Sequence, residues 1–174
     1  MKRVLVTGGA GFVGSSIAIA LKKHKTNLDV VVLDNLLRRG SEGNISILES
    51  HGIKFIHGDV RVPDDLQKTG KIDFLIECSA EPSVLAGSDG SPGYVIQTNL
   101  NGAVNCAEYC RQQSAGLLFL STSRVYSIDT LKEMSISEEE SRFVISKDQS
   151  VVGLSQTGVN EACSTTGFKS FYGA

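Results

Sequence analysis

Short apolar runs alternate with stretches of helical periodicity along most of this chain. The apolar runs predict buried strands at residues 3–7, 29–33, 53–57, 73–77 and 116–121. The stretches between them predict helices at about residues 12–24, 42–50, 63–69 and 92–113. Pro63 and Pro92 suit a first helical turn, and Ser91 is placed to cap the helix that follows it. This alternation predicts an α/β fold, a doubly wound parallel sheet with strand order 3-2-1-4-5.

Residues 127–168 break the alternation, because they contain a mixed polar run and no long apolar strand. We expect them to form a long loop insertion that carries at most short elements. The 174 residues otherwise favour one domain over residues 1–174. Its ligand site should lie at the carboxyl ends of the first and fourth strands, where the strand order reverses.

A glycine-rich turn follows the first strand, in the run Val-Leu-Val-Thr-Gly-Gly-Ala-Gly-Phe-Val-Gly at residues 4–14. Gly8 permits a sharp turn, Gly11 lets the backbone approach a ligand, and Gly14 lets the helix pack closely on the strand. The free N–H groups at the start of that helix can then bind an anion, and the expected anion is the pyrophosphate of a dinucleotide. The alternative is that these glycines only shape a loop.

The second strand ends in Asp34, 20 residues after Gly14. This is near the spacing of the carboxylate that accepts hydrogen bonds from an adenosine ribose. A carboxylate there favours NAD over NADP because it repels a 2′-phosphate, although Arg38 and Arg39 could each reach such a phosphate. The alternative is that Asp34 only caps a turn.

Three further loops should meet at the same edge of the sheet. After the third strand, Asp59 could accept from an adenine amino group beside the Val60 N–H, or it could be an ordinary turn residue. After the fourth strand, small residues at 79 and 80 would admit the ribose and nicotinamide, or would only form a tight turn. After the fifth strand, hydroxyls at 121–123 form a candidate proton-handling site. We expect Tyr126, which follows them, to pack rather than react.

Composition narrows the function classes. The net charge is −2 and there is no basic block, which disfavours nucleic acid or an anionic membrane as the main partner. No apolar run is long enough to span a bilayer, and Gly8 and Gly9 interrupt the N-terminal run too early for a signal peptide. The four cysteines have no metal-binding spacing, so we expect no metal and reduced thiols in a cytoplasmic protein.

Several of these motifs occur together, in order, in one known family. Thr-Gly-Gly-Ala-Gly-Phe-Val-Gly at 7–14, Asp-Asn-Leu at 34–36, Gly-Asp-Val at 58–60, Ser-Thr-Ser-Arg-Val-Tyr at 121–126 and Tyr-Gly-Ala at 172–174 resemble the extended short-chain dehydrogenase/reductase family. Its members are NAD-dependent nucleotide-sugar epimerases and dehydratases. Within the family, the runs at 34–40 and 121–127 most resemble the CDP-tyvelose (CDP-paratose) 2-epimerase branch.

The resemblance implies roles by position. Thr122 matches the catalytic hydroxyl residue and Tyr172 the catalytic tyrosine. The positions that it assigns to the NAD site are Gly8, Gly11, Phe12, Val13, Gly14, Asp34, Asn35, Arg39, Asp59, Val60, Cys78, Ser79, Ala80 and Asn99. Those that it assigns to the sugar substrate are Ser83, Ser123 and Arg124.

The sequence also departs from the family pattern. The 4,6-dehydratases carry an Asp-Glu pair where this chain has Ser123 and Arg124, which argues against dehydration. Glu77 stands where the family often has histidine. The family's lysine four residues after Tyr172, its last strands and its substrate domain would lie beyond Ala174. We therefore expect the 174-residue chain, an incomplete NAD-binding Rossmann domain, to bind NAD without turnover.

The resemblance implies epimerisation of a nucleotide-activated sugar, with a CDP-sugar favoured, through a transient ketone. The alternatives are a non-catalytic NAD-binding or redox-sensing module, or a decarboxylase, reductase or dehydratase of the same family. We expect a homodimer or homo-oligomer, and apolar surface exposed on the fifth strand and on the helix at 92–113.

Overall fold

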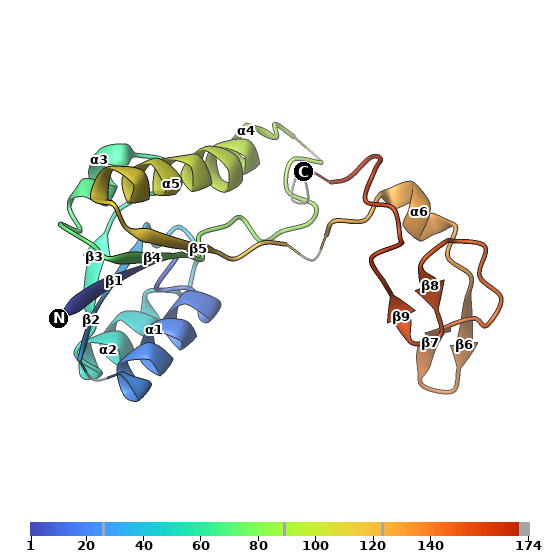
Figure 1. The fold of residues 1–174 in the computed structure, drawn as a ribbon, viewed down its shortest axis with the longest axis horizontal. Coiled ribbons are helices and arrows are strands. Elements are labelled where there is room, and N and C mark those ends of the chain that lie inside the picture. Colours follow the sequence, from blue (N-terminus) through green and yellow to red (C-terminus); the bar gives the residue numbers. More distant parts are fainter. Residues whose placement is uncertain (26, 89, 123, 171–174) are drawn as a thin grey trace.

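The computed structural model describes residues 1–170 except 26, 89 and 123. Five parallel strands form one sheet in the order β3-β2-β1-β4-β5 (Figure 1), which confirms the predicted topology. The strands are β1 (Lys2–Thr7), β2 (Leu28–Asp34), β3 (Lys54–His57), β4 (Phe74–Glu77) and β5 (Gly116–Phe119).

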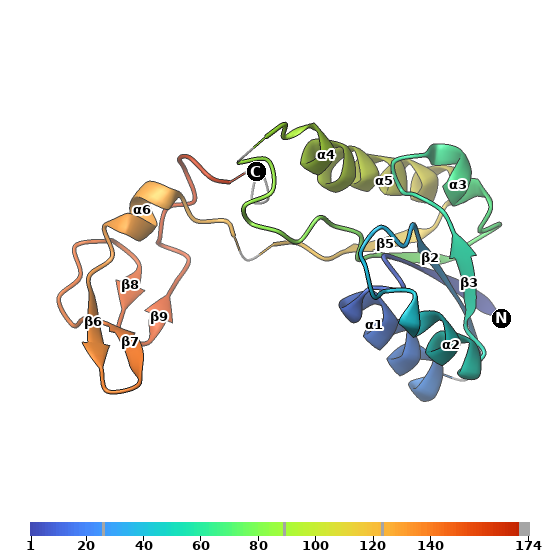
Figure 2. The same ribbon diagram turned by 180° about the vertical axis from the view of Figure 1, so that it is seen from behind.

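Helices cover both faces of the sheet. One face carries α1 (Phe12–His24) and α2 (Gly43–Ser50), and the other carries α3 (Pro63–Gln67), α4 (Gly93–Val95) and α5 (Gly102–Gln113) (Figures 1 and 2). Alternate side chains of β1 point to opposite faces. Val4 and Val6 pack with Leu48 of α2, whereas Leu5 packs with Leu66 of α3. Burial on both faces explains why the central strands have continuous apolar runs, at residues 4–6 of β1 and 30–33 of β2.

The helix predicted at 92–113 is continuous but not uniform. A six-residue π-helical stretch, η1 (Ile96–Asn101), separates α4 from α5. The helix begins at Gly93, one residue later than predicted, and Ser91 Oγ accepts a hydrogen bond from the Gly93 N–H at 3.2 Å. π-helical turns are rare, and those that occur are frequently at functional sites, so η1 is a candidate part of a functional site.

Residues 127–170 form short elements of their own. They comprise α6 (Ile128–Lys132), the antiparallel pair β6 (Ile136–Glu139) and β7 (Arg142–Ile145), and the antiparallel pair β8 (Leu154–Ser155) and β9 (Gly158–Val159). Ser127 Oγ caps α6 by accepting the Thr130 N–H at 3.1 Å, and the Ile128 N–H donates to the Phe168 carbonyl at 2.8 Å. These four strands do not join the sheet, and the segment lies to one side of it (Figures 1 and 2).

Apolar side chains are exposed on β5 and on the neighbouring helix, as expected. Leu117, Leu118 and Phe119 are 40%, 48% and 50% exposed, and Leu100 and Val104 are more than half exposed. Among the described residues, β5 pairs with β4 alone and forms an edge of the sheet.

Candidate functional site

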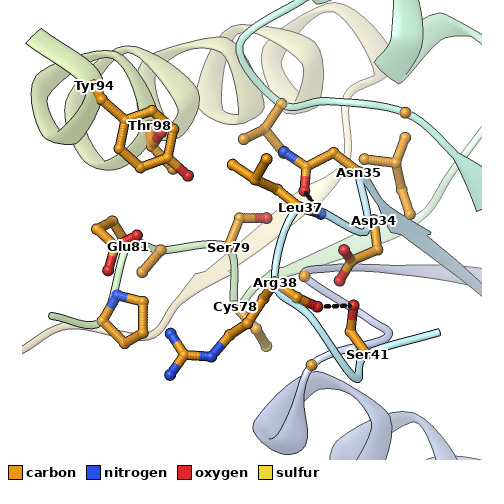
Figure 3. A pocket seen from close by; sticks show the side chains of 17 residues that line it. Asp34, Asn35, Leu37, Arg38, Ser41, Cys78, Ser79, Glu81, Tyr94 and Thr98 are labelled. Atoms are coloured by element: carbon orange, nitrogen blue, oxygen red, sulfur yellow. Dashed lines mark hydrogen bonds between the residues drawn. The ribbon is translucent and has the colours of Figure 1, made fainter. Parts of the chain in front are cut away.

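A cleft of about 190 Å³ opens at the carboxyl ends of β1, β2 and β4, where the strand order predicted a ligand site (Figure 3). It is lined by the loops that follow β1, β2, β3 and β4 and by the helical segment that contains Tyr94 and Thr98. Its lining includes eight residues that the sequence analysis assigned to the cofactor: Gly8, Gly11, Asp34, Asn35, Val60, Cys78, Ser79 and Ala80. The structure therefore brings most of the predicted cofactor residues to one place.

The glycine-rich loop has a geometry that larger residues cannot adopt without strain. Gly8 has a φ of +62°, and a Cβ atom there would lie 2.7 Å from the Cys78 carbonyl oxygen. A Cβ atom on Gly14 would lie 2.2 Å from the Gly8 carbonyl oxygen, so the helix packs directly on the turn. Helix α1 begins at Phe12, and the first N–H groups of an α-helix have no acceptor within the helix. This arrangement can bind an anion beside the loop.

Asp34 connects the end of β2 to the glycine-rich loop. Its Oδ2 accepts a hydrogen bond from the Ala10 N–H at 3.0 Å, and its Oδ1 accepts one from the Leu36 N–H at 2.8 Å. Asn44 of α2 fixes the same loop, because its Nδ2 donates to the Ala10 carbonyl at 2.8 Å. Asn44 was not predicted from the sequence, because it stands in no motif. The Asp34 carboxylate still lines the cleft, where its remaining lone pairs can accept from a ligand.

Asp59 is not among the residues that line the cleft, although its neighbours Gly58 and Val60 are. Arg61 donates to it from Nε to Oδ1 at 2.9 Å and from Nη2 to Oδ2 at 2.6 Å, and Asn35 Nδ2 donates to Oδ2 at 2.9 Å. These hydrogen bonds, led by those from Arg61, lower the pKa of Asp59 to about 2. The Arg61 guanidinium carbon also lies 5.3 Å from the ring centroid of Tyr94, which lines the cleft. Arg61 and Tyr94 stand in no motif and were not predicted from the sequence. The predicted contact of Asp59 with adenine stays a prediction.

Two side chains hold the loop that follows β4. Glu77 is 3% exposed, and its Oε1 accepts hydrogen bonds from the Ser79 N–H at 2.9 Å and from the Thr7 hydroxyl at 3.3 Å. Burial raises the pKa of Glu77 above its ordinary value. Asn99 accepts from the Glu81 N–H at 2.8 Å and donates to the Glu81 carbonyl at 3.4 Å. Asn99 therefore holds the loop in place, and its predicted contact with the cofactor stays a prediction.

The cysteines and acidic residues form no metal site in the described part of the chain, which contains no cluster of three or more His, Cys, Asp or Glu residues suited to a metal. All four cysteines are free thiols. Burial, followed by the charge of Glu77, raises the pKa of the Cys78 thiol to about 12, so this cleft residue is protonated at neutral pH. No helix among the described residues combines the length and the apolar character that a bilayer span requires.

The predicted catalytic and substrate residues are only partly described. Ser123 and Tyr172 lie outside the described residues. Thr122 and Arg124 lie in the loop after β5, where Thr122 Oγ1 accepts the Arg124 N–H at 3.0 Å. The Ser83 N–H donates to Glu81 Oε1 at 2.9 Å.

Other assignments differ in detail from the observed lining. Phe12 and Val13 are exposed at the start of α1. Arg38 rather than Arg39 lines the cleft (Figure 3). The lining residues that the sequence analysis did not assign to a ligand are Leu33, Leu37, Arg38, Ser41, Gly58, Glu81, Pro82, Tyr94 and Thr98.

Comparison with known proteins agrees with this geometry. The profile of the NAD dependent epimerase/dehydratase family matches residues 4–157. The chain belongs to this family. It is 31% identical to CDP-paratose 2-epimerase of Salmonella typhi over 147 residues, which cover 81% of this chain and 42% of that protein. It is 33% identical to UDP-glucuronic acid decarboxylase 6 of Arabidopsis thaliana, over 71% of this chain and 34% of that protein.

Solved structures of the family share this fold. The crystal structure of a UDP-glucuronic acid 4-epimerase mutant from Bacillus cereus, in complex with UDP-4-deoxy-4-fluoro-glucuronic acid and NAD, is 30% identical with a TM-score of 0.64. The match covers 80% of this chain and 44% of that one. The chain thus spans less than half the length of these family members.

Proposed function

We propose that this chain binds NAD in the cleft and provides the cofactor-binding part of a nucleotide-sugar epimerase, with a CDP-sugar as the favoured substrate. One observation carries the proposal: the glycine-rich loop, Asp34 and the small residues Ser79 and Ala80 line a single cleft. The relatives support it, since they include a CDP-paratose 2-epimerase and an epimerase whose structure contains NAD.

The residues of the cleft fit a dinucleotide. The first turn of α1 would bind the pyrophosphate through its free N–H groups. Gly8 and Gly14 have no side chains, so the loop and the start of the helix lie close together. Asp34 would accept from the hydroxyls of the adenosine ribose, and Gly58 and Val60 would contact the base. When bound, NAD supplies the acceptor and then the donor of hydride in an oxidation and re-reduction of the sugar.

Side chains of this protein would carry out the proton transfers. The Thr122 hydroxyl would hydrogen-bond to the reacting oxygen of the sugar, and Tyr172 would take the proton from that oxygen and later return it. Ser83, Ser123 and Arg124 would contact the substrate. Ser123 and Arg124 also favour epimerisation over 4,6-dehydration, because neither can act as the carboxylate acid or base of that reaction. The active form would be a cytoplasmic homodimer or homo-oligomer.

The test has two parts. Calorimetric titration of the 174-residue chain with NAD should show binding. A form extended to the length of its relatives should then epimerise a member of a panel of CDP- and UDP-sugars, whereas the 174-residue chain should not. Epimerase activity in the 174-residue chain would show that the family's lysine four residues after Tyr172 and its substrate domain are dispensable. An extended form that binds NAD and leaves the whole panel unchanged would favour a non-catalytic NAD-binding module.

A further inference from the structure

A buried carboxyl group joins two of the loops that line the cleft. Glu77, the last residue of β4, is 3% exposed. Its Oε1 accepts a hydrogen bond from the Ser79 N–H at 2.9 Å, in the loop after β4, and one from the Thr7 hydroxyl at 3.3 Å, at the end of β1. Ser79 lines the cleft, and Thr7 directly precedes Gly8 of the glycine-rich loop. Glu77 therefore contacts both loops, although it is not among the residues that line the cleft.

This carboxyl group has no cationic partner in the described part of the chain, since none of the ion pairs there includes Glu77. Its partners on the two neighbouring strands, Thr7 and Phe119, are uncharged. The titratable groups close to it are the thiols of Cys78 in the adjoining loop and Cys106 on α5. Burial, followed by the charge of Glu77, raises the pKa of both thiols, so both are neutral at neutral pH.

Glu77 can change its charge without releasing the loops. Burial raises its pKa, because the ionised form loses its hydration, while the hydrogen bonds from Ser79 and Thr7 act in the opposite direction. A neutral carboxyl group keeps an oxygen that can still accept from both donors. The two loops therefore stay connected in either protonation state.

A bound dinucleotide would change the surroundings of Glu77 in two ways. Its pyrophosphate would place negative charge beside the glycine-rich loop, which begins one residue after Thr7. The ligand would also exclude water from the side of the cleft where Ser79 lies. A like charge nearby and a loss of hydration both disfavour the ionised form of a carboxyl group. The two effects therefore favour protonated Glu77 in the complex.

We propose that binding of NAD is coupled to the uptake of a proton by Glu77, so that the affinity for NAD depends on pH. The proposal rests on the proposed function, since it takes the ligand to be NAD. At low pH, Glu77 is protonated with and without ligand, and NAD binds most tightly. As the pH rises above the ordinary glutamate pKa of 4.5, the free protein loses this proton first, and the affinity falls until Glu77 is ionised in both states.

Calorimetric titration with NAD from pH 5 to pH 8, in buffers with different enthalpies of ionisation, measures both the affinity and the protons taken up. We expect the parent to take up as much as one proton and to lose affinity roughly three- to thirtyfold over this range. Glu77→Gln stays neutral, so it should lose this uptake and should bind NAD more tightly than the parent at pH 8.

Glu108→Gln is the matched control. Glu108 lies on the exposed side of α5, where hydrogen bonds from Arg111 and then Gln112 lower its pKa to about 2. It stays ionised over the tested range, so this variant should keep the proton uptake and the pH dependence of the parent. Loss of the uptake in Glu108→Gln as well as in Glu77→Gln would refute the assignment to Glu77.

ADP-ribose tests the electrostatic cause. It keeps the pyrophosphate but lacks the cationic nicotinamide ring, so it should cause at least as much proton uptake as NAD. Binding of ADP-ribose without proton uptake would overturn the argument from the pyrophosphate charge, and the proposal with it.

An NMR titration of the Glu77 carboxyl carbon needs no variant, and it decides the question if Glu77→Gln does not fold. In the parent, saturating ADP-ribose should move the midpoint of this titration to higher pH. A midpoint that stays in place or moves to lower pH would contradict the proposal.

The remaining outcomes separate this inference from the proposed function. NAD binding that is independent of pH, that releases a proton, or that takes up as many protons in Glu77→Gln as in the parent would refute the role of Glu77 and leave the NAD site intact. Failure of the parent to bind NAD at any pH would instead remove the proposed function, and with it the basis of this inference.

Discussion

The Asp34 carboxylate accepts a hydrogen bond from the backbone N–H of Ala10 at 3.0 Å. This bond joins the carboxyl end of β2 to the glycine-rich loop, and it holds the carboxylate at the cleft. The two sequence features that first indicated a dinucleotide are therefore one physical unit in the folded chain.

Asp34→Asn should lower NAD affinity and reduce the preference for NAD over NADP. The amide keeps the shape but loses the charge that strengthens a hydrogen bond to ribose and repels a 2′-phosphate. Hydrogen bonds to charged groups contribute about 1.5–3 kcal/mol, so we expect NAD affinity to fall roughly ten- to hundredfold. Asp29→Asn is a matched control, because Asp29 lies near the other end of the same strand and pairs with Arg3. Equal losses in the two variants would contradict a ribose contact.

Gly8→Ala should destabilise the chain more than Gly52→Ala. Both glycines have similar positive φ values, +62° and +67°, so the backbone strain of alanine is matched. A Cβ atom at Gly8 would meet the Cys78 carbonyl at 2.7 Å, whereas at Gly52 the nearest atom is Cε of the flexible Lys22 at 3.9 Å. We expect an additional loss of about 1–3 kcal/mol in urea unfolding for Gly8→Ala. Similar losses would mean that the close approach to Cys78 is unimportant.

Glu77→Gln should be more stable than the parent, and the difference in stability should grow as the pH rises above the ordinary glutamate pKa of 4.5. The folded pKa of Glu77 is raised, mainly by burial, so the folded state binds the proton more tightly than the unfolded state. Its contribution is then fully present at low pH and is lost as the pH rises through the raised pKa. Glutamine stays neutral and can still accept from Ser79 and Thr7.

Urea unfolding of the parent and Glu77→Gln from pH 4 to pH 8 tests this. A parent that gains stability relative to Glu77→Gln with rising pH would show that the charged form is favoured.

Arg61→Gln should raise the pKa of Asp59 from about 2 towards its ordinary value of 3.8. The Arg61 hydrogen bonds lower that pKa most, so the ion pair stabilises the fold at higher pH. This contribution is lost as the pH falls through the folded pKa of about 2. The NMR titration of the Asp59 carboxyl carbon measures the change directly. Arg111→Gln, which breaks a similar pair with Glu108 on the exposed side of α5, should leave the Asp59 curve unaltered.

Thr122→Ala in an extended form should reduce turnover roughly 10²–10⁴-fold, the usual contribution of a positioned proton-handling group. NAD affinity should change little, because Thr122 lies after β5 and outside the cleft lining. The neighbouring Ser121→Ala is the control. A larger effect of Ser121→Ala on kcat would transfer the role to that hydroxyl.

The sheet was predictable because each central strand is marked by a short apolar run within its own residues. The central strands β1 and β2 are buried on both faces, and a continuous apolar run reports such burial directly. Pro63 opens α3 as predicted for the same local reason. The division of the helix at 92–113 was not predicted, because the apolar pattern does not distinguish a π-helical stretch from an α-helix, and Asn99 and Gly102 approach loops that are distant in the sequence.

The site was predictable to the extent that it follows motifs. Glycines and the strand-ending Asp34 have a fixed spacing, and the structure brings them together. Arg61, Tyr94, Asn44 and Thr98 belong to no motif of that kind. Their positions depend on tertiary contacts such as the stacking of Arg61 on Tyr94, which sequence spacing alone does not encode.

Calorimetric titration of this chain with NAD and, separately, with NADP tests the proposed NAD site most directly. We expect binding at a single site, tighter for NAD than for NADP, with a matching rise of the unfolding midpoint when NAD is present. Gly8→Ala and Asp34→Asn should both weaken NAD binding. Absence of binding at millimolar NAD would contradict the proposed NAD site, and tighter binding of NADP would contradict the role of Asp34.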